Sequence, residues 1–245
     1  MKVVFLGATS GMGRALARAL AQQGAQLALL GRQPEQLVRS AADLELHGAD
    51  PPVHTVPCDL AEPDTFAPAL AQADQLLNGF DTVVVTAGAF ATQDVLENDL
   101  DRAREVLDTD FTNTVLFCEL ARGRLLARGG GTLCVFTSVA GDRPRKPVIL
   151  YGAAKAGLSY YLEGLDHKYR AAGLRVIDVR PGFVRTRMTA GLKPPPFASN
   201  PDDVARVVLK ALRSKRPVIY APPVWRWVMF LIRRLPRFVL RRTEF

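Results

Sequence analysis

The sequence has few of the residues that bind metal ions or form disulfides. It holds 245 residues, among them only three cysteines and three histidines. The cysteine count is odd and no C-x-x-C motif is present, so we interpret the cysteines as packed core thiols. The histidines lie far apart without ligand spacing, so we interpret them as structural or surface residues and predict no metal. The six residues are Cys58, Cys118, Cys134, His47, His54 and His167.

The sequence also lacks a long apolar segment and, towards its end, acidic residues. No cleavage site of small residues follows a longer apolar region at the N-terminus, so a secretory signal is not indicated and a cytosolic catalytic body is expected. Residues 1–212 hold 23 basic and 23 acidic side chains, whereas residues 213–245 hold 9 basic ones and only Glu244. The distribution argues against nucleic-acid binding by the body and predicts something anionic beside the tail.

The N-terminus carries a pattern typical of a nucleotide-binding loop. The residues KVVFLGATSGMGRALARALAQQG read as a strand, a tight glycine turn and a helix, because a continuous apolar run changes to a helical period. Gly7, Gly11 and Gly13 let the backbone approach a pyrophosphate, whose charge the free N–H groups of the helix start would stabilise. A glycine pattern alone is weak evidence, but here the strand and the helix supply the required context.

Three further segments read as strands separated by helical periods. The second, AQLALLGR, ends at Gly31-Arg32, about where an NAD site would carry an acidic residue. Arg32 suits the 2′-phosphate of NADP instead, and its alternative interpretation is a solvated loop cation. The others are VHTVPCDL, whose Asp59-Leu60 could border the adenine, and FDTVVVTAGAF, whose Thr86-Ala87-Gly88 gives backbone access to the cofactor. The repeated βαβ pattern predicts a single α/β domain with a Rossmann-type, doubly wound parallel sheet.

Three polar side chains in the middle of the chain could carry out proton transfer. Tyr151 and Lys155 are four residues apart, so a helix that begins near Leu150 would place both on one face. We expect Lys155 to lower the pKa of Tyr151 from its usual value near ~10 towards working pH. Ser138 closes the run TLCVFTS, a predicted buried strand whose carboxyl end lies where ligands bind in α/β sheets. The Tyr-x-x-x-Lys pair alone is more often a plain helix surface, and the glycine loop reverses that judgement.

In their order and spacing these motifs resemble those of the short-chain dehydrogenase/reductase family over nearly the whole chain. The matching motifs are Gly7-x-x-x-Gly11-x-Gly13, Asp59-Leu60, Ala87-Gly88, Ser138, Tyr151-x-x-x-Lys155 and Pro181-Gly182-x-x-x-Thr186. The resemblance implies that Ser138 orients a carbonyl, Tyr151 transfers the proton, and Lys155 binds the nicotinamide ribose. The cofactor residues that it implies are Gly7, Thr9, Ser10, Gly11, Met12, Gly13, Arg32, Asp59, Leu60, Ala87, Gly88, Tyr151, Lys155, Pro181, Gly182, Val184 and Thr186.

The chain departs from the family pattern at three positions. Leu6 stands before Gly7 where the family usually has threonine, and Thr86 stands where asparagine is common. The segment TDFTNT places Asp110 where the family carries a structural asparagine, with Asn113 one helical turn later. Either Asp110 could hold a water, or Asn113 could approach the site if the helix is shifted. The fourth catalytic position is therefore open between Asp110 and Asn113.

Residues 184–200, after Gly182, lie where the family places its substrate lid, and three consecutive prolines from Pro194 would stiffen this loop. Asn200-Pro201-Asp202 then resembles a capped helix start, and RPVIY reads as a final strand. Between Ser138 and Tyr151 lies a basic cluster of Arg143, Arg145 and Lys146. These residues are either ordinary exposed cations or a contact for a substrate phosphate.

The chain ends in a basic amphipathic segment, residues 222–245, which we separate from the catalytic domain of residues 1–221. Its apolar run, Val224 to Ile232, is shorter than the about 20 residues of a bilayer span. On a helical wheel five arginines gather on one side, which predicts an interfacial helix with Trp225 and Trp227 in the lipid and Pro236 as a kink. A subunit contact is the alternative. The five are Arg226, Arg233, Arg234, Arg237 and Arg241.

The predicted function is NADP(H)-dependent reduction of a carbonyl on a lipid-like or lipid-linked substrate, by a homo-dimer or homo-tetramer at the inner face of a membrane. The last third of the chain, including RPGFVRTRMTAGLK, resembles bacterial reductases of polyprenylphosphoryl 2-keto-pentose, so a polyprenylphosphoryl keto sugar is one candidate. Ketosteroids, fatty or sphingoid ketones and small soluble carbonyls are alternatives. A catalytically silent NADP-binding regulator is a different class, supported only by Asp110.

Overall fold

The computed structural model describes residues 1–214 and 216–242 and is built on a sheet of seven strands. The strands lie in the order β3-β2-β1-β4-β5-β6-β7, and each neighbouring pair is parallel. The predicted single-domain, doubly wound α/β fold is therefore confirmed. The strands are β1 (Lys2–Leu6), β2 (Gln26–Gly31), β3 (Asp50–Pro57), β4 (Thr82–Val85), β5 (Gly131–Phe136), β6 (Leu174–Pro181) and β7 (Val218–Ala221).

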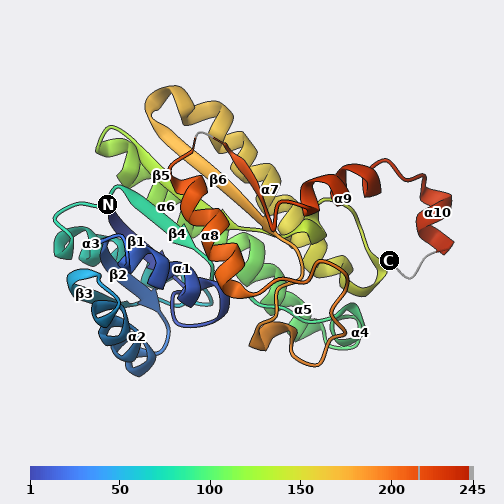
Figure 1. The fold of residues 1–245 in the computed structure, drawn as a ribbon, viewed down its shortest axis with the longest axis horizontal. Helices are drawn as coiled ribbons and strands as arrows, with labels where there is room; N and C mark the ends of the chain where they lie inside the picture. The colour runs from blue at the N-terminus through green and yellow to red at the C-terminus, as the bar shows by residue number, and fades with distance from the viewer. Residues whose placement is uncertain (215, 243–245) are drawn as a thin grey trace.

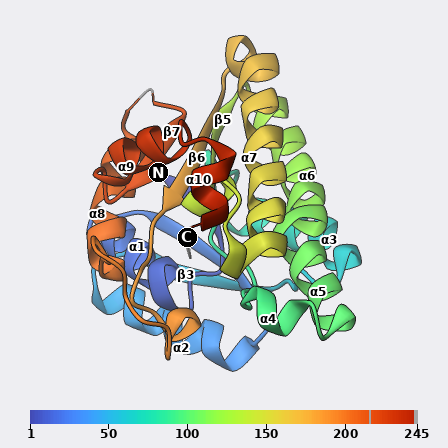
Figure 2. The same ribbon diagram turned by 90° about the vertical axis from the view of Figure 1, so that its right-hand side faces the viewer.

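Helices cover both faces of the sheet, as Figures 1 and 2 show. The alternation along β1 explains why two covers are needed: Val3 and Phe5 belong to one buried cluster, and Val4 and Leu6 to the other. The first cluster is closed by α1 (Gly11–Ala21), α2 (Pro34–Leu46) and α8 (Pro201–Leu212). The second is closed by α3 (Phe66–Leu76), α6 (Asn113–Ala127) and α7 (Ile149–Tyr169). Two smaller helices, α4 (Gln93–Leu96) and α5 (Leu100–Leu107), lie between β4 and α6.

The direction of winding reverses between β1 and β4, which are neighbours in the sheet. At such a switch point the loops that follow the two strands diverge to opposite faces and leave a crevice at the carboxyl edge. The loop that starts at Gly7 follows β1, and Thr86 follows β4. The fold thus brings the two predicted cofactor loops to one place.

The predicted start of α8 is confirmed in detail. Asn200 is the N-cap residue, Pro201 occupies the first turn, and Asp203 completes a reciprocal capping box with Asn200. The chain between β6 and α8 is closed at its base by a parallel bridge between Val184 and Ser199. Residues 185–198 therefore form a loop with two anchored ends.

The C-terminal tail forms two short helices instead of one continuous one. They are α9 (Trp225–Ile232) and α10 (Arg237–Arg242), and Pro236 lies in the break between them. Figure 1 shows α9 against the body and α10 standing out from it. Within residues 1–214 and 216–242, we find no helix with the length and apolarity that crossing a membrane requires.

The prediction that both tail tryptophans face lipid is wrong for Trp225. Its side chain is buried, and with Met229 it packs on Val139 in the body, whereas Trp227 is 64% exposed. The reason is the helical period: Trp225 and Met229 are four residues apart and share the inner face of α9, and Trp227 lies on another face. The tail is thus both a part of the core and an exposed surface.

Candidate active site

The glycine turn after β1 is held by close contacts that leave no room for side chains. Gly7 has a φ of 99°, which side-chain-bearing residues rarely adopt. A methyl group on Gly13 would overlap the carbonyl oxygen of Gly7 and lie 2.5 Å from Oγ1 of Thr86. The Thr86 hydroxyl donates to the carbonyl oxygen of Gly7 at 3.0 Å. Thr86, one of the departures from the family pattern, therefore ties the end of β4 to this turn.

The same turn fits a dinucleotide. Helix α1 begins at Gly11, and the side chain of its N-cap residue, Ser10, makes no capping hydrogen bond, so backbone donors of the first turn stay available to an anion. The loop after β6 comes close to Gly11: a methyl group built on Gly11 would lie 3.4 Å from Cγ2 of Thr186. Thr186 therefore lies beside the start of α1.

The catalytic candidates converge at the carboxyl edge of β5. Ser138 follows this strand and its Oγ accepts a hydrogen bond from the backbone N–H of Ala140 at 3.1 Å. Tyr151 and Lys155 lie in the first two turns of α7, which begins within one residue of the predicted start. Ser138 lies near enough to Tyr151 to lower the pKa of its phenol, and Nζ of Lys155 lies 5.8 Å from the centre of the tyrosine ring. The three side chains form one group.

Asp110, rather than Asn113, completes this group. The chain between α5 and α6 widens into a π-helical turn, η2 (Asp108–Thr112), a form that often marks functional sites. The turn directs the fully buried Asp110 to Lys155, whose Nζ donates to Oδ1 at 3.1 Å. Asn113 instead donates from Nδ2 to the carbonyl oxygen of Leu60 at 2.7 Å. Its alternative placement at the catalytic centre is therefore wrong, because the extra residue of the π-turn rotates it away.

The Asp110 carboxylate is further fixed by the loop after β4. Oδ1 accepts the backbone N–H of Ala89 at 3.0 Å, and a methyl group on Gly88 would lie 2.6 Å from the same oxygen. Oδ2 is buried and makes no hydrogen bond within the described protein. The predicted cofactor residue Gly88 is thus a glycine because the ion pair of Asp110 and Lys155 lies against it.

Burial dominates the electrostatics of the group. It raises the pKa of the Tyr151 phenol above its ordinary value; Lys155 acts in the opposite direction, but Asp110 reinforces the rise. Burial alone would lower the pKa of the Lys155 ammonium, yet the Asp110 carboxylate raises it. Burial also raises the pKa of the Asp110 carboxyl against the pull of Lys155. The predicted lowering of the Tyr151 pKa is therefore wrong here, because burial outweighs the charge of Lys155 and Asp110 adds to the rise.

A second buried network supports the loop that carries Ser138. Arg180 on β6 binds Oδ1 of Asp142 and Oδ2 of Asp178, each at 2.7 Å. The hydroxyl of Tyr220 donates to the other oxygen of Asp142 at 2.7 Å, and Thr137 donates to Asp178. The network therefore joins β6, β7 and Thr137, which follows β5, to Asp142 in the loop after Ser138. Sequence reasoning missed it, because β6, which carries Asp178 and Arg180, was not predicted as a strand.

The basic cluster between Ser138 and Tyr151 is partly engaged with the tail. Nη2 of Arg143 donates to the carbonyl oxygen of Leu235 at 2.9 Å. Burial lowers the pKa of the Arg145 guanidinium, which lies near Tyr151. Arg145 and Lys146 each interact with other groups of the protein. The cluster is therefore a part of the wall around the site instead of a row of free surface cations.

The remaining predicted cofactor residues lie around the same edge. Arg32 is exposed directly after β2, and Asp59 and Leu60 follow β3, with Leu60 tied to Asn113. Gly182 follows β6 and donates its N–H to the carbonyl oxygen of Ala221 at 3.0 Å. Pro181 and Val184, on either side of it, are buried, and Met12 packs against the core below the loop. The residues Ala87 and Gly88 lie beside Gly7, where a methyl group on Gly7 would approach the N–H of Ala87 to 2.5 Å.

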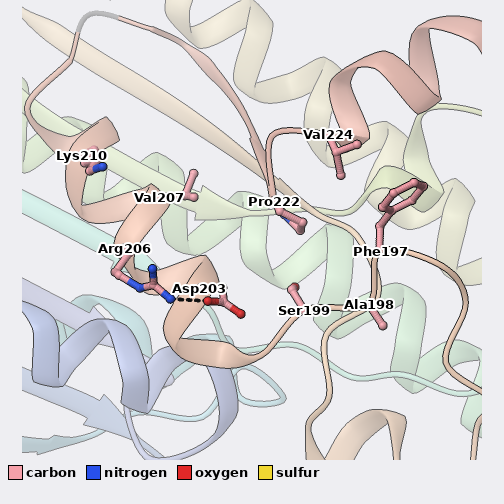
Figure 3. A pocket seen from close by; sticks show the side chains of 9 residues that line it. All are labelled: Phe197, Ala198, Ser199, Asp203, Arg206, Val207, Lys210, Pro222 and Val224. Carbon is pink, nitrogen blue, oxygen red and sulfur yellow. Dashed lines mark hydrogen bonds and ion pairs between the residues drawn. The ribbon is translucent and has the colours of Figure 1, made fainter.

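A separate cavity of about 410 Å³ lies outside this edge, between the end of the loop after β6, α8 and the start of the tail (Figure 3). None of its lining residues belongs to the predicted catalytic or cofactor set. They are Phe197, Ala198, Ser199, Asp203, Arg206, Val207, Lys210, Pro222 and Val224. Among the described residues no cluster of three potential metal ligands occurs, and the three cysteines are buried and free.

A glycine cradle at a switch point beside a serine, tyrosine and lysine defines a dehydrogenase or reductase of the nicotinamide-dependent type. The chain belongs to the short-chain dehydrogenase family, whose pattern it matches over residues 1–196. It is an oxidoreductase of that family, which binds NAD or NADP.

Two similar proteins carry only the general name of oxidoreductase. An uncharacterised oxidoreductase of Mycobacterium tuberculosis is 36% identical over 98% of this chain and 96% of its own length. A further uncharacterised oxidoreductase, from Streptomyces coelicolor, is 34% identical over 98% of this chain and 94% of its own. A short-chain dehydrogenase/reductase structure from Mycobacterium ulcerans has a TM-score of 0.82 and 22% identity, covering 99% of this chain and 98% of that one. This last likeness concerns the fold alone.

Proposed function

We propose that this protein is an NADPH-dependent carbonyl reductase whose substrate is lipid-like or lipid-linked and which works at the inner surface of a membrane. The observation that carries the proposal is the group of Ser138, Tyr151 and Lys155 beside the glycine cradle. The rest of the proposal rests on the charges around that group and on the tail.

The geometry supports proton transfer from the protein to a carbonyl oxygen. Bound NADPH would supply the hydride that adds to the carbonyl carbon. Ser138 would hold the carbonyl oxygen by a hydrogen bond, and the Tyr151 phenol would donate its proton to that oxygen as negative charge develops. Lys155 would then stabilise the tyrosinate and, on its other side, bind the nicotinamide ribose. An alcohol is the product, and the raised pKa of Tyr151 keeps the phenol protonated for this direction at neutral pH.

Asp110 fixes Lys155 in place for this role. The carboxylate accepts from Nζ at 3.1 Å, while the carbonyl oxygen of Phe136 lies 3.5 Å from the same nitrogen. Two acceptors from different elements hold the long side chain against α7. The other carboxylate oxygen of Asp110 is where a water would bind if one relays the proton to solvent.

The choice of NADPH over NADH is supported by positive charge at the adenosine end. Gly31 supplies no carboxylate there, and Arg32 is exposed next to it. A cavity of about 360 Å³ beside Thr9 and Ser10 is flanked by arginines from α1, α2 and the loop after β6. Of these, Arg18 is paired with Asp43 at 2.8 Å and Arg39 more loosely with Glu35 at 3.8 Å. The other two are Arg14 and Arg187.

The lipid-like substrate is supported by the tail. Its outer surface carries Trp227, Phe230 and Leu231, which are 64%, 46% and 65% exposed, on a helix whose other face is seated on the active-site wall. Residues 222–242 contain six arginines and no acidic residue. Exposed aromatic and basic side chains together suit the headgroup region of an anionic membrane. Arg145 and Lys146, at the wall of the site, could then meet a phosphate on a lipid carrier such as a polyprenylphosphoryl keto sugar.

A turnover screen tests the proposal. NADPH oxidation is followed with lipid-linked keto sugars, long-chain ketones, ketosteroids and small soluble ketones at matched concentrations, with and without vesicles that contain anionic lipid. We expect the highest kcat/KM for a lipid-like ketone. Preference for small soluble ketones would contradict the lipid assignment. Binding of NADPH without turnover of any ketone would instead identify a silent NADP-binding regulator.

A further inference from the structure

The inner face of α9 reaches the two loops that form the nicotinamide end of the proposed site. Trp225 is 6% exposed and Met229 is 1% exposed, and both form one buried cluster with Val139, the residue directly after Ser138. Tyr220 holds Asp142 and the carbonyl oxygen of Leu235 accepts from Arg143, so the C-terminal segment contacts the Ser138 loop at three successive places. Much of one wall of the site is thus built by the last part of the chain.

The indole of Trp225 lies directly over Gly182. A methyl group built on Gly182 would overlap Nε1 and Cε2 of that ring and lie 2.5 Å from Cδ1, and these are its three nearest atoms. The φ of Gly182 does not lie in the left-handed region, so its backbone would accept any ordinary residue. The reason for a glycine here is therefore the space that the indole takes, since no backbone strain demands it.

Hydrogen bonding does not account for this contact. Nε1 of Trp225 is buried and has no acceptor within the described protein. A buried donor without an acceptor opposes the arrangement, so packing must hold the ring against Gly182 and Val139. The turn from β7 into α9 helps, because Ala221 accepts the N–H of Gly182 and Pro222 accepts the N–H of Trp225.

We propose that Trp225 is a positioning residue of the active site: its indole sets the place of the Gly182 turn and of the Ser138 loop, and so makes the tail a working part of the catalytic centre. The proposal rests on the proposed function for the reaction that it affects. Met229 provides a matched control. It belongs to the same buried cluster as Val139 and Trp225, but the three atoms nearest to a methyl group on Gly182 all belong to Trp225.

A double-mutant cycle tests this role. Gly182→Ala is expected to lower kcat for NADPH-dependent ketone reduction by at least about ten-fold, because the new methyl group displaces the indole and the turn together. In the Trp225→Ala background the same change should cost clearly less, since the indole no longer occupies the space; a remaining loss would report the contact of Gly182 with the cofactor itself. In the Met229→Ala background the full loss should persist. Trp225→Phe should keep more activity than Trp225→Ala, since a smaller ring still fills the site.

A thermal-unfolding cycle on the same variants needs no substrate, so it remains decisive if no ketone is turned over. Gly182→Ala should lower Tm in the parent and in Met229→Ala but hardly in Trp225→Ala. Equal losses of kcat or Tm from Gly182→Ala in all three backgrounds would overturn the proposal, as would a harmless Gly182→Ala in the parent. If Gly182→Ala alone fails to fold, the double variant with Trp225→Ala must fold, and its failure would equally overturn the proposal.

Discussion

The catalytic body and the tail place their basic residues in opposite surroundings. In the body, Lys155 is 5% exposed and bound by Asp110, and Arg180 is held between Asp142 and Asp178. In the tail, the arginines are exposed, and no ion pair found among residues 1–214 and 216–242 involves them. A buried charge needs a partner to be tolerated, whereas an exposed row of arginines stays available to an outside anion. In the body these charges hold side chains in place, whereas the charges of the tail remain exposed to solvent.

Removal of Lys155 should produce the largest effect on the body's side of this comparison. Lys155→Met leaves the Asp110 carboxylate buried and unpaired, which should cost about 3–5 kcal/mol of unfolding free energy. Turnover and NADPH binding should fall as well, because the ribose loses its partner. Denaturant unfolding and NADPH fluorescence titration measure these losses. In the double variant with Asp110→Asn most of the stability should return while turnover stays absent; unchanged NADPH affinity in Lys155→Met would disprove the ribose role.

Charge reversal at the adenosine end should have the next largest effect. Arg32→Glu removes a charged hydrogen bond to the 2′-phosphate, worth about 1.5–3 kcal/mol, so kcat/KM for NADPH should fall roughly 10- to 100-fold. NADH should become equal or better, because the new carboxylate can accept from the ribose hydroxyls. Arg104→Glu, on an exposed arginine of α5, serves as the control for net charge. A parent enzyme that uses both cofactors equally well would contradict the preference.

Neutralised tail arginines should affect attachment and leave the chemistry alone. Each arginine near an anionic surface contributes about 1 kcal/mol, so Arg233→Gln and Arg234→Gln should each weaken vesicle binding about five-fold. Sedimentation with vesicles of increasing anionic content, at low and high salt, measures this, with kcat for a soluble ketone unchanged. Protein that stays in the supernatant under every condition would contradict membrane attachment. Variants that break an oligomer without altering vesicle binding would identify the tail as a subunit contact.

The smallest expected effect is a shift in the pH dependence of kcat when Asp110 is replaced. Burial is the main cause of the raised pKa of Tyr151, and the Asp110 carboxylate adds to it. Asp110→Asn keeps an acceptor for Lys155 and removes that added negative charge, so the pKa should fall. Reduction needs the phenol, so its rate should decline at a lower pH than in the parent as pH rises. Alcohol oxidation needs the phenolate and should begin at a lower pH. Profiles of kcat against pH in both directions check this, and coincident profiles for parent and variant would show that Asp110 does not act on Tyr151.

Local patterns allowed most of the fold to be predicted from the sequence. Apolar runs identified six of the sheet's seven strands, β1 to β5 and β7, because a buried parallel strand is apolar on both faces. Strand β6 was not among those predictions. Its Arg175, Asp178 and Arg180 interrupt the run, and the polar network that tolerates them forms only between segments far apart in the sequence.

The candidate site was predictable as a set of residues but not as an electrostatic unit. Spacing on one helix was enough to pair Tyr151 with Lys155. The position of Asp110 depends on a π-turn, which no period in the sequence announces, and the pKa of Tyr151 depends on how deeply the fold buries it. The contact of Trp225 with Gly182 joins β6 to the tail, so only the folded chain reveals it.

The identity of the proton donor is the central claim, and turnover by Tyr151→Phe tests it most directly. This change removes the transferable proton and keeps the ring, so NADPH affinity should stay within about two-fold of the parent. General acid catalysis typically contributes about 10²–10⁴-fold. The rate of NADPH oxidation with a saturating ketone should therefore fall by at least about 10²-fold. Near-native turnover in Tyr151→Phe would contradict the account, because the proton would then have to come from another group.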